Sequence, residues 1–207
     1  MILFGNKMTG LVKASFLLSA LVALLLSAGC DHAPEIVQIS GSKFGTSYNI
    51  TIVADQPAPA DLAERIDAAL DVVDLSMSTY KSESELSLFN RLPVGEEAVA
   101  SAELWTVLQT SRHIWQQSAG AFDPSVGPLV DLWGFGPQMT NDQIPTDNEI
   151  TQALATTGYQ HLILNPANQS ISKDLALRLD LSAVAKGYAV DQVAELLVQR
   201  PTASMST

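Results

Sequence analysis

Cysteine and histidine are scarce in this sequence of 207 residues, which contains one cysteine, Cys30, and three histidines. A single cysteine excludes an internal disulfide and a cysteine-based metal site. His32, His113 and His161 are scattered, without the spacing of metal ligands. The sequence also lacks a Ser-His-Asp arrangement, a P-loop and a dinucleotide-binding GxGxxG motif. These absences exclude several classes of enzyme.

Basic residues are also few, since 11 Lys and Arg stand against 22 Asp and Glu, a net charge of −11. Removal of the first 29 residues, which hold Lys7 and Lys13 but no acidic residue, would leave nine basic residues and a net charge of −13. This charge argues against nucleic acid or an anionic membrane surface as a partner. A phosphorylated ligand would need local compensation from a divalent cation or a helix N-terminus.

The N-terminal segment is typical of an exported protein. Lys7 and Lys13 precede an uncharged run, residues 14–29, that is shorter than the roughly 20 residues of a membrane-spanning helix. The run ends in "LSAGC", which resembles the lipobox of bacterial lipoproteins, with Cys30 as the lipidated residue. Asp31 resembles the residue that retains such lipoproteins in the inner membrane. We expect a signal peptide over 1–29 and a tether over 30–35; an ordinary signal peptide or an uncleaved anchor are the alternatives.

Hydrophobic periodicity predicts an α+β domain over residues 36–199, with mixed or antiparallel sheets, and a patternless tail over 200–207. Strands are expected at "IVQIS", "YNITIV" and "LALRLDL", and a hairpin at "HLILN" and "SIS". Helices are expected after Asp61, at "SELSLFN", after Ser101, after Thr146 and over residues 182–199. Capping boxes are predicted at Asp61 with Glu64 and at Thr146 with Glu149. The core face of the last helix is predicted to contain Val190, Val193, Leu196 and Leu197.

The sequence "LDLSAVAKGYAVD", residues 179–191, has the strongest potential for chemistry. A strand is expected to end at Asp180, and Ser182 is expected to cap the following helix, which carries Lys186 one turn in. A carboxylate, a helix N-terminus and a lysine so close together suit a metal-bridged diphosphate. In the alternative, Asp180 and Ser182 only cap a core helix, and Lys186 and Asp191 lie on its solvent-exposed face.

The stretch "GAFDPSVGPLVDLWGFGP", residues 120–137, is rich in glycine and proline, and we expect neither regular helix nor central strand there. Pro124 biases Asp123 toward an extended backbone, and Phe122 supplies a flat apolar surface. These features suit an aromatic ring with a polar edge. Trp133 and Phe135 are expected to brace the loop from behind. The alternative is an apolar loop folded over the core.

Two further stretches each place an aromatic ring next to a lysine or a glycine. In "MSTYKSES", Tyr80 can stack on a base while Lys81 meets a phosphate; the alternative is an exposed turn. In "SKFGTSYNIT", Phe44 and Gly45 could flank a ligand; the alternative is an ordinary hairpin turn.

Taken in order, "FGTSYNI", "DLSMSTYKSESELSLFN", "GAFDPSVGPLVDLWGFGP" and "LDLSAVAKGYAVD", with the lipobox, resemble the ApbE family of FAD:protein FMN transferases. The resemblance implies a membrane-anchored enzyme that faces the bacterial periplasm. It implies that the enzyme uses Mg²⁺ to cleave FAD, attaches FMN to a threonine or serine hydroxyl of a partner flavoprotein, and releases AMP. A non-catalytic FAD-binding lipoprotein and an inactive fragment are the alternatives.

The same resemblance implies the roles of individual residues. Asp180 would be catalytic, and Ala183 would offer a backbone carbonyl to Mg²⁺. The implied FAD contacts are Phe44, where the family usually has methionine, and Tyr80, Ala121, Phe122, Asp123, Asp180 and Lys186. The family pattern continues beyond the match with an aspartate and a nearby threonine or serine that complete the metal site. We therefore expect a C-terminally truncated family member.

Overall fold

The computed structural model describes residues 34–137 and 144–198. These fall into two compact units, residues 34–38 with 51–58, and residues 39–50 with 59–137 and 144–198. The predicted signal peptide, Cys30 and the segment 200–207 lie outside the described residues. Within them, no helix has the length and apolar character needed to cross a membrane.

The first element is a hairpin of β1 (Glu35–Lys43) and β2 (Thr46–Ala54), which pair in a two-stranded sheet as predicted. Its turn consists of Phe44 and Gly45, with φ of 55° and 71°. Two consecutive positive φ angles are typical of a type I′ turn. Glycine adopts this conformation freely, whereas in an L-residue such as Phe44 it costs about 1–2 kcal/mol. The strained turn therefore places the large ring of Phe44 at the end of the hairpin.

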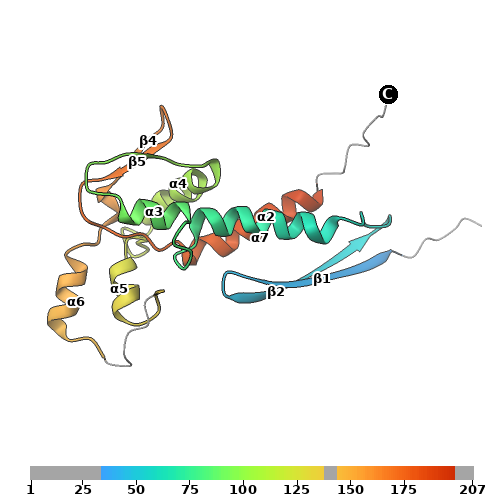
Figure 1. The fold of residues 1–207 in the computed structure, drawn as a ribbon, viewed down its shortest axis with the longest axis horizontal. Helices are drawn as coiled ribbons and strands as arrows, with labels where there is room; N and C mark the ends of the chain where they lie inside the picture. The colour runs from blue at the N-terminus through green and yellow to red at the C-terminus, as the bar shows by residue number, and fades with distance from the viewer. Residues whose placement is uncertain (1–33, 138–143, 199–207) are drawn as a thin grey trace, which may run out of the picture. The chain divides into compact units, whose positions relative to one another are not determined.

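The main core lies around α2 (Leu62–Met77) and α7 (Ser182–Val198), which run side by side in opposite directions (Figure 1). The buried stripe of α2 recurs every three or four residues and consists of Leu62, Ile66, Leu70, Val73 and Met77. On α7 the buried stripe is Ala185, Ala189 and Val193. The prediction was therefore right for Val193 and wrong for Val190, which is 67% exposed. Val190 lies off the buried stripe because that stripe repeats every four residues from Ala185.

The described residues also form the α-helices α3 (Glu85–Arg91), α4 (Ala102–Gln117), α5 (Gly127–Leu132) and α6 (Asp147–Leu154), and the short 3-10 helix η1 (Tyr159–His161). Ser101 caps α4 by accepting from the Leu104 N–H, and the capping box of Thr146 and Glu149 forms at α6. The capping box predicted at Asp61 is wrong, since the Asp61 side chain makes no capping hydrogen bond. The helix α5 corrects the expectation that residues 120–137 contain no helix. Pro128 is compatible with it because the first turn needs no N–H donor.

The second sheet has the strand order β3 (Ala98–Val99), β5 (Ser170–Lys173), β4 (Leu162–Asn165), and both pairings are antiparallel. It contains the predicted hairpin, with Leu162 opposite Lys173. Helices packed with antiparallel sheets confirm the α+β class.

The strand predicted over residues 175–181 is wrong, because only Arg178 forms a bridge, to Val126. The Asn90 side chain replaces a neighbouring strand here. Its amide nitrogen donates to the Leu179 carbonyl at 2.9 Å, and its oxygen accepts from the Leu179 N–H at 2.8 Å. The Arg178 carbonyl accepts from the Gly127 N–H, and the Asp180 N–H donates to the Pro124 carbonyl. The segment therefore pairs with a side chain and a loop in place of a neighbouring strand.

Lys173 is a buried lysine that ties β5 to the end of α3. It is 2% exposed, and its Nζ donates to the carbonyls of Phe89, Asn90 and Leu177 at 3.2, 3.0 and 3.3 Å. Burial, with a smaller contribution from Arg178, lowers the pKa of the Lys173 ammonium. Its role is therefore to donate to three carbonyls in the core.

Replacement of this donor should destabilise the fold. Lys173→Met leaves the three carbonyls without their partner, and we expect it to lower the free energy of unfolding by about 1–3 kcal/mol. Urea unfolding followed by circular dichroism measures the effect, with exposed Lys186→Met as the control. An unchanged unfolding midpoint in Lys173→Met would contradict this role.

Candidate functional site

A cavity of about 560 Å³ lies where the end of α2, the segment leading to α3, the first turns of α7 and the hairpin turn meet. This volume is within the range of small-molecule sites. The wall has an aromatic part, a basic part and hydroxyl groups. These are Phe44, Tyr80 and Phe135; Lys81 and Lys186; and Ser78, Thr79 and Ser182. The structure therefore brings together Phe44, Tyr80 and Lys186, which the sequence analysis singled out in three separate stretches.

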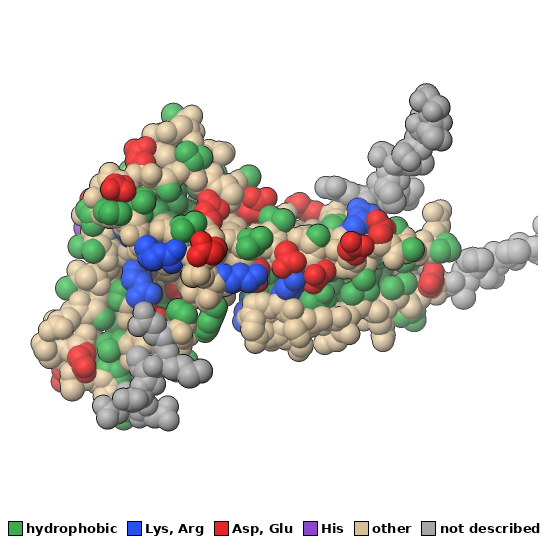
Figure 2. All heavy atoms as spheres, in the orientation of Figure 1, with side chains coloured by type: hydrophobic (Ala, Val, Ile, Leu, Met, Phe, Trp, Pro, Cys, Tyr) green, Lys and Arg blue, Asp and Glu red, His purple; other side chains and the backbone are tan. Residues whose placement is uncertain are grey.

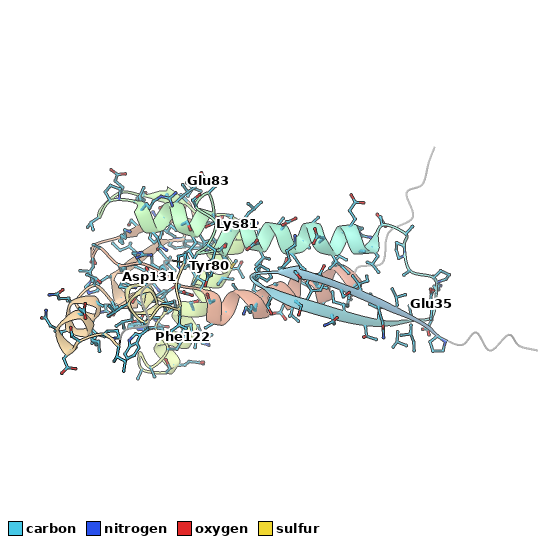
Figure 3. All side chains as sticks on the ribbon, turned by 60° about the horizontal axis from the view of Figure 1, so that its bottom comes forward. Glu35, Tyr80, Lys81, Glu83, Phe122 and Asp131 are labelled. Carbon is cyan, nitrogen blue, oxygen red and sulfur yellow. The ribbon has the colours of Figure 1, made fainter. Side chains whose placement is uncertain are left out.

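The segment that carries Tyr80 is fixed by serine hydroxyls. The Ser78 Oγ accepts from the backbone N–H groups of Tyr80 and Lys81 at 3.2 and 3.3 Å. The Ser84 and Ser87 hydroxyls, at the start of α3, both donate to the Ser78 carbonyl. The position of Tyr80 and Lys81 therefore depends on α3 as well as on α2 (Figure 3).

Tyr80 also spans the cavity to the far end of the glycine-rich stretch. Its hydroxyl donates to the Phe135 carbonyl at 3.2 Å, while the residue stays 69% exposed. A ring that is open to solvent and held at its hydroxyl can stack on a planar ligand.

Acidic and basic side chains adjoin one another over α2 (Figure 2). Lys81 Nζ lies 2.6 Å from the carboxylate of Asp74, which is buried. Lys43 Nζ lies 3.0 Å from Asp67 and 2.7 Å from Asp71. Hydrogen bonding to Asp71 raises the pKa of Lys43, and the same contact lowers the pKa of Asp71. The negative charge of α2 is thus partly neutralised beside the cavity.

Asp180 lies directly before α7, as predicted. Its carboxylate accepts from the Ser182 N–H at 2.8 Å, and its own N–H donates to the Pro124 carbonyl at 2.8 Å. Ser182 is therefore the first residue of the helix, and Asp180 satisfies its amide, in place of the expected cap by the Ser182 side chain. Lys186, one turn further on, is exposed and lines the cavity.

Ala121, Phe122 and Asp123 do not line this cavity. Phe122 lines a neighbouring cavity of about 740 Å³ between α4 and α7, together with Ala183, and Ala121 is exposed. The Asp123 carboxylate accepts from the Ser125 N–H and hydroxyl at 2.8 and 2.6 Å, and from the Tyr159 N–H at 3.1 Å. In this structure Asp123 joins its loop to the turn that precedes β4.

The expectation that Trp133 and Phe135 brace the loop from behind is wrong. They are 47% and 76% exposed, and Phe135 lines the cavity. Gly134, with a φ of 76°, and Gly136 flank Phe135. A Cβ at Gly136 would lie 1.8 Å from the Asp131 carboxylate, so the chain turns tightly here. The Gly-Phe-Gly spacing was the signal in the sequence for an outward-facing ring.

A metal site is not complete among residues 34–137 and 144–198. No three His, Cys, Asp or Glu side chains converge in this part of the chain. Ala183 is the second residue of α7, and its carbonyl would be a single ligand. Mg²⁺ prefers six oxygen ligands. The described residues alone therefore do not fit a Mg²⁺ ion.

The fold and the cavity define an α+β protein whose aromatic and basic cavity lies next to the N-terminus of a helix. The chain belongs to the ApbE family, whose model matches residues 44–205. The match continues into the tail, 200–207, that the sequence analysis placed outside the domain.

The chain is similar to proteins named FAD:protein FMN transferase. It is 44% identical to that of Vibrio cholerae over 184 residues, 87% of this chain and 54% of the relative. It is 39% identical to that of Escherichia coli K12 over 191 residues, 86% of this chain and 54% of the relative. The chain thus spans about half the length of the curated relatives it matches.

Solved structures give the same assignment. The flavin transferase ApbE from Vibrio cholerae has a TM-score of 0.75 and 42% identity, covering 79% of this chain and 53% of that one. The apo form of the Pseudomonas stutzeri flavinyl transferase ApbE has a TM-score of 0.73 and 34% identity, covering 79% and 52%.

Gly127 joins the glycine-rich stretch to the segment before α7. Its N–H donates to the Arg178 carbonyl at 3.2 Å, and a Cβ would approach that oxygen to 2.7 Å. Gly127→Ala must therefore displace backbone, and we expect a loss of about 1–3 kcal/mol in unfolding free energy. Thermal and urea unfolding of Gly127→Ala and of the unsubstituted chain measure this loss.

Gly187→Ala is the matched control, because a Cβ there meets nothing within 4 Å on α7. It should raise the stability by up to about 1 kcal/mol. Equal effects of the two substitutions would refute the close approach at Gly127.

Proposed function

We propose that this chain takes part in flavin transfer, in which FAD is cleaved, FMN is attached to a threonine or serine hydroxyl of a partner flavoprotein, and AMP is released. The observation that carries the proposal is the convergence of Phe44, Tyr80 and Lys186 on one cavity beside the N-terminus of α7. The names of the relatives support FAD as the substrate.

The cavity offers complementary chemistry to the two parts of FAD. The rings of Phe44, Tyr80 and Phe135 suit a planar ring system. The Lys186 ammonium and the positive end of the α7 helix dipole suit the negative charge of the diphosphate. Lys81 and Lys186 thus place positive charge in a wall that also contains the Asp74 carboxylate, in a chain whose net charge is −11.

In the proposed reaction the acceptor hydroxyl attacks the phosphorus on the FMN side of the diphosphate. A new P–O bond forms, the P–O bond to AMP breaks, and AMP leaves with the bridging oxygen while the hydroxyl proton passes to a base. Lys186 and the helix N-terminus would stabilise the charge that develops on the phosphate oxygens. The acceptor supplies the nucleophile, so a nucleophilic residue in this chain is not required.

Mg²⁺ dependence is part of the proposal because the family resemblance implies it, with the Ala183 carbonyl as one ligand. Residues 34–137 and 144–198 do not complete a metal site by themselves. Bound at the diphosphate, Mg²⁺ would supply further charge neutralisation.

Asp180→Ala should reduce FMN transfer by about 100-fold or more, because misplacement of the start of α7 disturbs the diphosphate site. Full chain, FAD, Mg²⁺ and a co-expressed acceptor flavoprotein are combined. AMP release is then measured by chromatography, and covalent flavin by in-gel fluorescence. Asp61→Ala, at a carboxylate with no capping bond, is the control and should retain activity.

Transfer by Asp180→Ala at the level of the unsubstituted chain would contradict a role for Asp180 in the reaction. FAD binding without AMP release by the unsubstituted chain would instead favour a non-catalytic FAD-binding lipoprotein. Absence of FAD binding would favour an inactive fragment.

We also propose that the protein is lipid-anchored in the bacterial inner membrane and faces the periplasm. Support comes from the lipobox-like "LSAGC" and from Asp31 after the cysteine. A lipid on Cys30 would hold the body at the membrane without a membrane-spanning helix.

Cys30→Ser should abolish incorporation of labelled palmitate, because serine has no thiol to form the thioether. Metabolic labelling followed by membrane fractionation tests this, with Ser40→Ala, at an exposed serine outside the lipobox, as the control. Unchanged palmitate incorporation in Cys30→Ser would refute the anchor.

A further inference from the structure

We propose that Lys81 is a second cation for the diphosphate of the bound flavin nucleotide and sets a preference for phosphorylated flavins over riboflavin. The inference rests on the proposed function, which assigns the cavity to FAD. It adds a residue that recognises the phosphate from the segment after α2.

Lys81 follows Tyr80 directly, and the same Ser78 hydroxyl accepts from the N–H groups of both residues. The ring and the ammonium are therefore presented together, on a segment held by α3 (Figure 3). A ligand with a planar ring and a nearby anion would meet both side chains at once.

The partner of Lys81 is Asp74. Asp74 lies on the last turns of α2, and its side chain is 11% exposed, whereas that of Lys81 is 44% exposed. The contact of 2.6 Å between them uses one donor of the ammonium. A lysine ammonium has three donors, so two remain for a ligand. Asp74 thus restricts Lys81 to the cavity wall without using all of its hydrogen-bonding capacity.

In the wall of this cavity the basic side chains are Lys81, from the segment after α2, and Lys186, from the first turns of α7. Lys43, nearby on β1, contacts two carboxylates, Asp67 and Asp71, and is not part of this wall. A diphosphate carries a negative charge on each phosphorus, and two separated ammonium groups match it better than one.

A purely structural role for the pair of Lys81 and Asp74 makes a different prediction. If the ion pair only held the segment after α2 against that helix, its loss would weaken the binding of every flavin alike. Phosphate recognition instead weakens FAD and FMN and leaves riboflavin, which has no phosphate, almost unchanged.

The test is a titration of the full chain with FAD, FMN and riboflavin, in which binding is measured as quenching of flavin fluorescence. We expect Lys81→Met to weaken FAD and FMN binding about tenfold or more, as for a charged hydrogen bond. Riboflavin binding should change less than about twofold. The loss for FAD should shrink as the salt concentration rises, because ions screen this attraction.

Two further variants separate recognition from folding. Lys81→Arg keeps the charge and should retain FAD binding. The double variant Asp74→Asn with Lys81→Met removes the buried carboxylate that Lys81→Met alone leaves unpaired. It should show the same selective loss of FAD and FMN binding, with riboflavin binding nearly unchanged, as Lys81→Met.

Equal weakening of the three flavins by Lys81→Met, or unchanged FAD binding, would overturn the inference. Absence of flavin binding by the unsubstituted chain would overturn both the inference and the proposed function. FAD binding that depends on Lys81, without FMN transfer, would support the inference and contradict the transferase proposal.

Discussion

The packing of α2 against α7 is the interaction on which the rest of the site depends. The two helices run in opposite directions, so the last turns of one and the first turns of the other lie at the same end. That end carries Val73 and Met77 from α2, and Ser182 and Lys186 from α7. The apolar stripes that stabilise the helices therefore also fix the distance between the two halves of the cavity wall.

The glycine-rich stretch contributes to the site mainly by holding α7 in place. Pro124 and Gly127 form hydrogen bonds with residues 180 and 178, and the Asp123 carboxylate fastens the same loop to Tyr159. Only the end of the stretch, at Phe135, lines the cavity beside Tyr80. Gly127 is explained by its close approach to the Arg178 carbonyl, and Gly120 and Gly134 by their positive φ angles. The composition of the stretch therefore does not by itself mark a ligand-binding loop.

Local patterns predicted most of the elements because their signals are local. The hairpin, the capping box of α6 and the positions of α2, α3, α4 and α7 follow from alternation, caps and helical spacing. The strand over 175–181 failed because the segment bonds to the side chain of Asn90 and to the loop at Pro124 and Gly127, which no local pattern reveals. The grouping of Phe44, Tyr80 and Lys186 was predicted from family resemblance. Phe135 was misplaced because its contact with Tyr80 is between residues 55 positions apart in the sequence.

The central claim is that a flavin nucleotide binds in the cavity between the end of α2, the hairpin turn and the start of α7. Amide hydrogen exchange of the full chain, with and without FAD, tests it most directly. The account predicts slower exchange at residues 44–45, 78–81 and 182–186 when FAD is present, and no change in β3, β4 and β5. Exchange that is unaltered at these three segments while FAD is bound would contradict the account.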